Sequence, residues 1–343
     1  MQAVVIHKAR DLRIETRDTP EPGPGQVAIA IKRGGICGSD LHYYRHGGFG
    51  AIRLQEPMVL GHEVAGEITG VGAGVAGLKP GDVVAVSPSL PCGLCSFCQK
   101  GLQNHCLEMR FYGSAMRMPH VQGAFQQSLV AEARQCHVVS PGTSVEMAAF
   151  AEPFAVTLHA IARAGSLAGK HVLVTGCGPI GVLAVVAARA HGAQEIIATD
   201  VFDYTLGLAC QAGADAGINV STGPDAMADF KRNKGAFDVM IEASGNEAAL
   251  RTGLECLKPR GILVQLGLGG DISLPQNMIV AKEIEIRGSF RFHEEFALAV
   301  DMINKRRVNL LPLLTEVVPL ADAVKAFDLA SDRTRAMKVQ IAF

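Results

Sequence analysis

The stretch that most constrains the fold reads HVLVTGCGPIGVLAVVAARAHGAQEIIATD, residues 171–200. It joins a β-branched run, a glycine-rich turn, an apolar segment and a second β-branched run that ends in an acid. Gly176, Gly178 and Gly181 allow, respectively, a tight turn, close approach of a pyrophosphate to the backbone, and close packing of helix on strand. Pro179 suits the first turn of a helix, where no amide donor is needed. The stretch therefore predicts a strand–helix–strand unit with a dinucleotide bound at the helix N-terminus.

An acid at the end of the second predicted strand indicates which dinucleotide binds. Asp200 follows Gly176 by 24 residues, and a carboxylate there accepts the adenosine ribose hydroxyls and repels a 2′-phosphate. No lysine or arginine occurs in the segment DVFDYTL, so the sequence favours NAD and leaves NADP as the alternative cofactor. Further candidate cofactor contacts are Ile180, Ser244, Leu266 and Ser289. The competing interpretation is that the glycines only form turns.

Two different residue patterns divide the chain into domains. Before about residue 145, short alternating strands are separated by turns such as GVGAGVAGLKPGD, which is typical of β-rich, barrel-like structure. From residue 171, six apolar, β-branched runs alternate with helical segments, which predicts a doubly wound parallel sheet. We therefore expect an α/β domain over residues 147–290, inserted into a β-rich domain formed by residues 1–146 and 291–343.

The composition argues against several classes of function. The 343 residues are 48% hydrophobic and 19% charged, with a net charge of −1, so no broad basic surface for nucleic acid is expected. The one basic run, residues 305–307, is more typical of a solvated helix end. The most apolar segment, residues 182–188, is far shorter than the roughly 20 residues of a membrane helix. No signal-peptide pattern opens the chain, and we expect a cytoplasmic protein.

Four of the nine cysteines lie close together in the segment PCGLCSFCQKGLQNHC. Their spacing, C-x2-C-x2-C-x7-C, lets one loop wrap a metal ion, and four thiolates suit a closed tetrahedral zinc site of structural type. The predicted ligands are Cys92, Cys95, Cys98 and Cys106. An iron–sulfur cluster also agrees with this spacing, whereas a nucleic-acid-binding knuckle would need a more basic surround than the single Lys100.

Four further cysteines stand singly among apolar or small residues: Cys136, Cys177, Cys210 and Cys256. A free cysteine in such surroundings behaves as a small hydrophobic residue. We therefore expect all four to be buried in the core without a chemical role.

A second, mixed set of metal-binding side chains is spread over three short segments, CGSDLH, GHE and FAEPFAV. Its members are Cys37, Ser39, His42, His62, Glu63 and Glu152. Taken singly, a cysteine is a core thiol about as often as a ligand, and a lone histidine is usually structural. Taken together, sulfur, imidazole and carboxylate are the donors of a catalytic zinc site.

Read in order, these motifs resemble the zinc-dependent medium-chain dehydrogenases of the alcohol and polyol group. The likeness spans the whole chain and rests on GGICGSDLHYY, VLGHEVAG, the four-cysteine segment, AEP, VTGCGPIG, Asp200 and GSFRF. It implies a GroES-like catalytic domain with an inserted Rossmann domain. Within the family, RGGICGSDLHYY, MRFYGSAM, PHV, AEP and RGSFRF are most similar to the branch that oxidises L-idonate to 5-ketogluconate.

The resemblance also implies roles for the mixed set. Cys37 and His62 bind a catalytic zinc, and Glu63 is a ligand directly or through water. Glu152 stands where alcohol dehydrogenases of the family supply a second cysteine, so it serves the catalytic metal directly or through a bound water. One thiolate donates less charge than two, so a more Lewis-acidic zinc with an open position is expected.

The same resemblance implies catalysis by hydride transfer. Zinc lowers the pKa of a substrate hydroxyl from about 16 towards about 7, and the alkoxide transfers hydride to the nicotinamide. Ser39 receives the displaced proton and passes it through the cofactor ribose to His42, which titrates near neutral pH.

Charged and aromatic side chains indicate the class of substrate. Tyr43, Arg291 and His293 are candidates to bind hydroxyls or a carboxylate, because the planar fork of arginine matches a carboxylate. The alternative for Arg291 is a surface ion pair with Glu294 or Glu295. The residues expected either to line the pocket or to pack in the core are Phe111, Tyr112 and Phe292.

We therefore expect an oxidoreductase that transfers hydride from a secondary alcohol of a sugar acid, L-idonate, to NAD. A dehydrogenase of neutral polyols such as sorbitol or xylitol is the first alternative, and a threonine dehydrogenase is the second. Outside this class, the alternatives are a zinc-bearing nucleic-acid-binding protein and a family member without activity. By analogy with the family we expect a homodimer or homotetramer, with no nucleic-acid or membrane partner.

Overall fold

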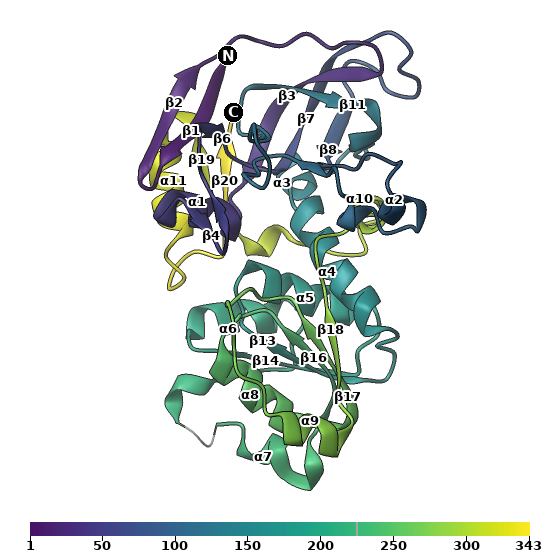
Figure 1. Ribbon diagram of the computed structural model, residues 1–343, viewed down its shortest axis with the longest axis vertical. Helices are drawn as coiled ribbons and strands as arrows, with labels where there is room; N and C mark the ends of the chain where they lie inside the picture. The colour runs from purple at the N-terminus through teal and green to yellow at the C-terminus, as the bar shows by residue number, and fades with distance from the viewer. Residues whose placement is uncertain (224–225) are drawn as a thin grey trace. The chain divides into compact units, whose positions relative to one another are not determined.

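The computed structural model describes residues 1–223 and 226–343, which form two compact units (Figure 1). The first unit consists of Met1–Glu152, Phe296–Asp332 and Lys338–Phe343. The second unit consists of Pro153–Glu295 and Arg333–Met337. The second unit is thus made almost entirely of one internal segment, and both ends of the chain belong to the first.

The first unit is built around a seven-stranded sheet whose main path runs β12-β8-β7-β3-β20-β19, with β11 paired to β3. Its strands are β3 (Gln26–Gly35), β7 (Glu63–Val71), β8 (Val83–Val86), β11 (Ser128–Glu132), β12 (Cys136–Val138), β19 (Leu314–Pro319) and β20 (Lys338–Ala342). The C-terminal strand β20 pairs antiparallel with β3. Residues near the end of the chain therefore lie beside residues near its beginning.

Small sheets and short helices complete this part of the chain. An antiparallel hairpin lies at the N-terminus, where β1 (Gln2–Lys8) pairs with β2 (Asp11–Thr16). The remaining short strands are β4 (Gly48–Phe49), β5 (Ile52–Arg53), β6 (Met58–Val59), β9 (Ser89–Leu90) and β10 (Arg110–Phe111). The helices are α1 (Gly38–His46), α2 (Ser96–Gln99), α3 (Val145–Ala148), α10 (Glu295–Asn304) and α11 (Ala323–Ala330).

The second unit contains six parallel strands in the order β15-β14-β13-β16-β17-β18. They are β13 (His171–Thr175), β14 (Glu195–Asp200), β15 (Ala216–Asn219), β16 (Phe237–Glu242), β17 (Leu257–Gln265) and β18 (Glu285–Gly288). The helices around them are α4 (Ala151–Ala164), α5 (Pro179–Ala190), α6 (Asp203–Gln211), α7 (Ala228–Lys231), α8 (Glu247–Cys256) and α9 (Gln276–Lys282) (Figure 1). The strand order reverses between β13 and β16, so the predicted doubly wound parallel sheet is confirmed.

Apolar runs in the sequence become buried elements in this unit. Residues 172–175 of β13 are all buried, as a strand covered on both faces requires. Helix α5 buries residues 181–188 without interruption. Although α5 is apolar, neither it nor another helix of the described residues has the length and hydropathy needed to cross a membrane.

The single cysteines do not all pack as expected. Cys177 and Cys256 are buried and Cys136 is half-buried, but Cys210 is exposed. The prediction of a buried Cys210 is therefore wrong. Helix α6 buries Thr205, Leu206 and Ala209, and the residue after Ala209 is rotated by about 100° to the outer face of the helix.

Candidate functional site

Cys37 lies at the point where β3 gives way to α1. Its backbone is extended, with φ −91° and ψ 159°, and it forms the N-cap of the helix. The backbone N–H of Cys37 donates to Oδ2 of Asp40, in the first turn of α1, at 3.0 Å. This capping interaction fixes the start of the helix and with it the position of the cysteine backbone.

His62 and Glu63 lie at the start of β7, where Glu63 faces Gly35 of β3 in the antiparallel register. The end of β3 and the start of β7 are therefore neighbours. One ligand atom from each of Cys37, His62 and Glu63 lies within 4.8 Å of the others. His62 is 5% exposed and Glu63 is 0% exposed. The structure thus brings three of the predicted metal-binding residues into one group, which we call the mixed group; Cys37 is half-buried and the other two are buried.

Asp40 connects the two segments that carry the mixed group. It is fully buried, and its Oδ1 accepts the backbone N–H of Gly61 at 3.1 Å while its Oδ2 accepts that of Cys37. Oδ1 also lies 3.8 Å from Nδ1 of His62. Asp40 is not among the site residues predicted from the sequence. The signal that would have found it is an acid at the third position of a helix that begins at a candidate ligand.

Lys338 is a second residue at the site that was not predicted from the sequence. This lysine of β20 is 3% exposed and forms a close ion pair with Oε2 of Glu63. Its Nζ also donates to the backbone oxygen of Ile36 at 3.1 Å. The pair occupies the space above Gly35, where a Cβ atom would overlap the Glu63 carboxylate. The sequence feature that could have indicated this residue is a single lysine within the apolar run AMKVQIAF. A lysine that is buried with such a run is usually paired with an acid.

Three buried atoms of the mixed group have no hydrogen-bond partner among the described residues: Nδ1 of His62 and both carboxylate oxygens of Glu63, of which Oε2 is held in the ion pair with Lys338. A buried polar atom without a partner is costly, so this arrangement calls for a further ligand. A thiolate, an imidazole and a carboxylate form the donor set of a catalytic zinc that keeps an open position. The residues present therefore fit a zinc ion.

Burial and neighbouring charges shift the pKa values of the acids around the mixed group. Burial, together with the Glu63 carboxylate, raises the pKa of the Cys37 thiol to about 11. Burial also raises the pKa of Glu63, against the opposing charges of Lys338 and His62. Burial raises the pKa of Glu152 to about 8. Protons therefore compete with a metal ion for these side chains, and binding of the metal releases the protons.

Glu152 lies next to the mixed group without belonging to it. It occupies the first turn of α4 and is 5% exposed. Its carboxylate is not among the atoms that lie within 4.8 Å of one another. After burial, the largest influences on its pKa are the charges of His62 and Glu63.

Ser39 and His42 lie one turn apart on α1. The Ser39 hydroxyl is close enough to the Cys37 thiol to oppose, weakly, the rise in the pKa of that thiol. His42 is exposed, and the partial burial of its ring, with the charges of His46 and Arg45, lowers its pKa. A neutral imidazole at the surface can exchange protons with water.

Three predicted aromatic residues of the first unit have different surroundings. Tyr43 is 2% exposed, and its hydroxyl accepts a backbone N–H at 3.0 Å, so the side chain is packed in the core. Tyr112 donates its hydroxyl proton to Oε1 of Gln135 at 3.2 Å. Phe111 is the one that contacts the mixed group, because its ring centroid lies 5.5 Å from that of His62.

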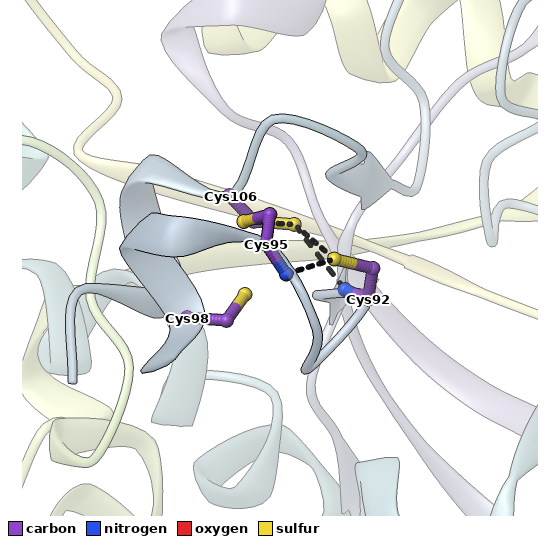
Figure 2. Close-up of side chains that lie close together, drawn as sticks. All are labelled: Cys92, Cys95, Cys98 and Cys106. Carbon is purple, nitrogen blue, oxygen red and sulfur yellow. Dashed lines mark hydrogen bonds between the residues drawn. The ribbon is translucent and has the colours of Figure 1, made fainter. Parts of the chain in front are cut away.

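The four cysteines of the predicted zinc loop come together around α2. Their sulfur atoms all lie within 4.8 Å of one another, and the side chains turn toward a common centre (Figure 2). The residues are Cys92, Cys95, Cys98 and Cys106. Leu94 and Leu107 of the same segment are 80% and 64% exposed. A segment that leaves its leucines in solvent has little core of its own, so a bound metal would anchor it.

Backbone amides prepare this loop for thiolates. The N–H groups of Leu94 and Cys95 both donate to the sulfur of Cys92 at 3.4 Å. Hydrogen bonds from the N–H groups of Cys98 and Leu107 lower the pKa of Cys95 to about 6. Burial raises the pKa of Cys98 to about 12. The four sulfurs and their amide donors fit a closed tetrathiolate zinc site.

The glycine-rich turn of the second unit has the tight geometry that its sequence predicts. Gly176 has a φ of 83°, and a Cβ atom on it would lie 2.7 Å from Cα of Ser244. A Cβ atom on Gly181 would overlap the carbonyl oxygen of Gly176. Gly178 is the N-cap of α5 and Pro179 is its first residue. Only glycine fits at positions 176 and 181.

Asp200, at the end of β14, faces this turn. Its Oδ2 accepts the backbone N–H of Cys177 at 2.5 Å, and its Oδ1 accepts those of Val201 and Phe202 at 2.6 and 3.1 Å. A cavity of about 350 Å³ lies at the carboxyl ends of β13, β14 and β16. Residues of the predicted cofactor set that line it are Gly176, Asp200 and Ser244.

The other predicted cofactor residues lie outside the lining of this cavity. Ile180 follows Pro179 in the first turn of α5. The N–H of Leu266 donates to the backbone oxygen of Glu242 at 2.9 Å. The N–H of Ser289 donates to the backbone oxygen of Gln265 at 3.0 Å. The buried hydroxyl of Ser289 has no hydrogen-bond partner among the described residues.

Residues 291–295 were expected to contact the substrate or to form surface ion pairs. Arg291 has a φ of 54°, and its guanidinium lies 5.0 Å from the centre of the Phe290 ring. Glu295 accepts the backbone N–H of His293 at 3.0 Å and also pairs with His159. Phe292 is 1% exposed and packs in the core.

Two family models match the chain. The model of the alcohol dehydrogenase GroES-like domain matches residues 23–141, and the model of the zinc-binding dehydrogenases matches residues 179–305. The GroES-like and Rossmann parts implied by the resemblance are therefore confirmed.

Relatives match almost the whole chain. L-idonate 5-dehydrogenase (NAD(P)(+)) of Escherichia coli K12 is 44% identical, over 96% of this chain and 95% of the relative. Sorbitol dehydrogenase of Gallus gallus is 35% identical, over 99% of this chain and 95% of the relative. The crystal structure of the E. coli L-idonate 5-dehydrogenase matches with a TM-score of 0.94 and 41% identity, over 100% of this chain and 98% of that chain. Because such identity extends from end to end, this chain belongs to the zinc-binding medium-chain dehydrogenase family.

Proposed function

We propose that this chain oxidises L-idonate to 5-ketogluconate and transfers the hydride to NAD. Membership of the family supports the wider class, a zinc-dependent dehydrogenase of polyols or sugar acids. The observation that carries the reaction class is the mixed group, in which ligand atoms of Cys37, His62 and Glu63 lie within 4.8 Å of one another. The substrate rests on the higher identity with the L-idonate enzyme than with sorbitol dehydrogenase.

In this proposal the mixed group holds the catalytic metal. Oε2 of Glu63 is engaged by Lys338, so Oε1, which has no hydrogen-bond partner, is the ligand atom. Glu152 lies outside the group and acts through a water molecule. Zinc bound there supplies a Lewis acid that lowers the pKa of a substrate hydroxyl, and NAD supplies the hydride acceptor.

We assign the removal of the proton to α1. Ser39 follows Cys37 by two residues, and its Oγ accepts the proton that the substrate hydroxyl loses while its own hydroxyl proton is passed on. His42 lies one turn further along the helix surface, and its lowered pKa keeps the imidazole neutral and able to take up that proton. Because His42 is exposed, it then passes the proton to water.

The preference for NAD rests on Asp200. Three backbone N–H groups hold its carboxylate at the cavity beside the glycine-rich turn. A fixed negative charge accepts ribose hydroxyls and repels a 2′-phosphate. The related L-idonate dehydrogenase is named for both NAD and NADP, so we expect a preference between the two cofactors and not an exclusion.

A panel of substrates tests this proposal. L-idonate, D-gluconate, sorbitol, xylitol and threonine would each be supplied with NAD and with NADP, and reduction of the cofactor followed at 340 nm. We expect the highest kcat/KM with L-idonate and NAD. Sorbitol or xylitol as the best substrate would overturn the choice of substrate but keep the reaction class. Turnover that survives removal of zinc would overturn both.

The edge of the second unit supports a homo-oligomer. β18 is the last strand of the six-stranded sheet, so one side of it has no strand partner among the described residues. Large apolar side chains near it are exposed: Val280 by 69%, Ile286 by 42% and Phe290 by 42%. An unpaired strand with apolar neighbours suits pairing with a second copy. We propose a dimer that pairs through this strand. Light scattering measures the molar mass, and we expect the dimer mass for the wild-type protein and the monomer mass for Ile286→Lys.

A further inference from the structure

Glu242 is a buried carboxylate that the proposed chemistry does not use. It is the last residue of β16, at the carboxyl end of the strand, and it is 0% exposed. β16 lies between β13 and β17 in the sheet. The side chain therefore stands in the middle of the edge that faces the dinucleotide cavity.

Donors from three adjacent strand ends converge on this carboxylate. From the loop after β16 come the backbone N–H groups of Ser244 and Gly245, at 2.8 and 3.0 Å, and the Ser244 hydroxyl. Nε2 of Gln265, at the end of β17, donates at 2.7 Å. The hydroxyl of Thr175, at the end of β13, donates at 3.4 Å.

All of these donors are neutral. Among the residues that the structure describes, no cation forms an ion pair with Glu242. A buried carboxyl group without a cation is stable only when hydrogen bonds satisfy both of its oxygens. The six contacts to Glu242 meet this requirement, and each of them uses the carboxylate as an acceptor.

The loop that Glu242 holds is the surface against which the glycine-rich turn lies. The Cβ that Gly176 lacks would meet Ser244 at 2.7 Å. The Cβ that Gly267 lacks would lie 2.7 Å from Oε2 of Glu242, and the N–H of Gly267 donates to the Glu242 backbone oxygen at 2.8 Å. A displacement of Ser244 and Gly245 would therefore reach the glycine-rich turn directly.

The same loop forms part of the cavity wall. Gly176, Ser244 and Asn246 all line the cavity, whereas Glu242 does not. We infer that Glu242 is a positioning residue for the dinucleotide, which acts by holding the Ser244–Gly245 loop against the glycine-rich turn. This inference rests on the proposed function only in taking the cavity as the cofactor site.

Replacement by glutamine isolates the charge and the acceptor atoms. Glutamine has nearly the same shape, but it offers one acceptor oxygen and an NH₂ group in place of the second. At least one N–H or hydroxyl donor would then face a donor, and the loop would have to shift. Glu195→Gln is the matched control. Glu195 is the first residue of β14, so it lies at the amino ends of the strands, away from the cavity at their carboxyl ends, and it is half-exposed.

The experiment compares NADH binding by wild-type, Glu242→Gln and Glu195→Gln protein, followed by the fluorescence of the reduced nicotinamide. We expect Glu242→Gln to raise the Kd about tenfold or more, and Glu195→Gln to stay within about twofold of wild type. In steady-state assays the KM for NAD should rise, while the KM for the alcohol stays within about twofold. The zinc of the tetrathiolate loop should be retained, because it lies in the first unit.

Equal NADH affinity in Glu242→Gln and wild type would overturn the inference. Equal increases in both KM values would also overturn it, because they indicate general damage. Gln265→Met carries the test if Glu242→Gln does not fold, since it removes one donor and should raise the NADH Kd by a few-fold; an unchanged Kd there would contradict the inference. Failure of the wild-type protein to bind NADH would overturn the proposed function and this inference with it.

Discussion

Lys338 and Glu63 form an ion pair that is closed off from water, with 3% and 0% of their side chains exposed. Removing two charges from water is costly, and their attraction offsets that cost only while both are present. Lys338 also donates to the backbone oxygen of Ile36, the residue before Cys37. The lysine therefore ties the carboxylate of the mixed group to the segment that carries its sulfur.

Loss of this lysine should be costly to stability. We expect Lys338→Met to lower the free energy of unfolding of the zinc-loaded protein by about 2 kcal/mol, because Oε2 of Glu63 loses its charged donor and remains buried without a partner. Urea unfolding followed by circular dichroism measures the change. Lys32→Met is the control, because its contact with Glu67 is 4.0 Å long and exposed, and it should cost less than about 1 kcal/mol. Equal losses in the two variants would contradict this account.

A second prediction at the residue scale concerns pH. Burial raises the pKa of Glu295, but hydrogen bonds from His159 and the His293 backbone outweigh it and lower the pKa to about 2. A carboxylate with a lowered pKa stabilises the fold above its unfolded pKa, and this stability is lost as pH falls through the folded pKa. His159→Leu should therefore be less stable than wild type at pH 5 and above, and the difference should shrink between about pH 4.5 and 2. Unfolding midpoints over this range measure the effect, and a difference that grows on acidification would count against it.

At the scale of elements, α9 and α8 are joined through one ammonium group. Nζ of Lys282, the last residue of α9, donates to the backbone oxygens of Leu254, Glu255 and Leu257 at 3.2, 2.7 and 2.8 Å. The last carbonyls of a helix have no partner within the helix and carry the negative end of its dipole. Lys282 therefore caps the C-terminus of α8.

Removal of this cap should loosen the second unit. We expect Lys282→Met to lower the free energy of unfolding by about 1 kcal/mol, because three carbonyl groups lose a charged donor that is only partly buried. Lys325→Met gives the comparison, since its side chain is 80% exposed and forms an ion pair with Asp322 at the same helix end. Chemical unfolding of both proteins measures the difference. No loss in Lys282→Met would show that water replaces the cap.

The sequence predicts the elements of the second unit well, because its strands are apolar runs covered on both faces and its glycine-rich turn permits few conformations. It also predicts that Cys37, His62 and Glu63 carry metal-binding chemistry, and the structure brings these three together. The sequence does not predict the residues that hold these three side chains in place, Asp40 and Lys338. Lys338 reaches Glu63 only because β20 pairs with β3 after the whole second unit has been inserted, and no local pattern reports that pairing. The prediction that Cys210 is buried is wrong for a simpler reason: a surface helix buries only one face, and Cys210 lies on the other face of α6.

At the scale of the whole molecule, the metal groups and the dinucleotide cavity belong to different units. Both cysteine-containing groups lie in the first unit, and the cavity beside the glycine-rich turn lies in the second. A change in one unit can therefore remove one ligand while the other ligand still binds. This separation makes the role of each metal group testable on its own.

The central claim is that the mixed group holds a zinc ion needed for hydride transfer, apart from the zinc of the tetrathiolate loop. Zinc per chain, measured by mass spectrometry together with turnover, tests it in wild type and in Cys37→Ala. We predict two zinc ions per wild-type chain, and one in the variant, which should fold, keep NADH binding and lose turnover. One zinc ion per chain in both proteins, with turnover unchanged, would contradict the account.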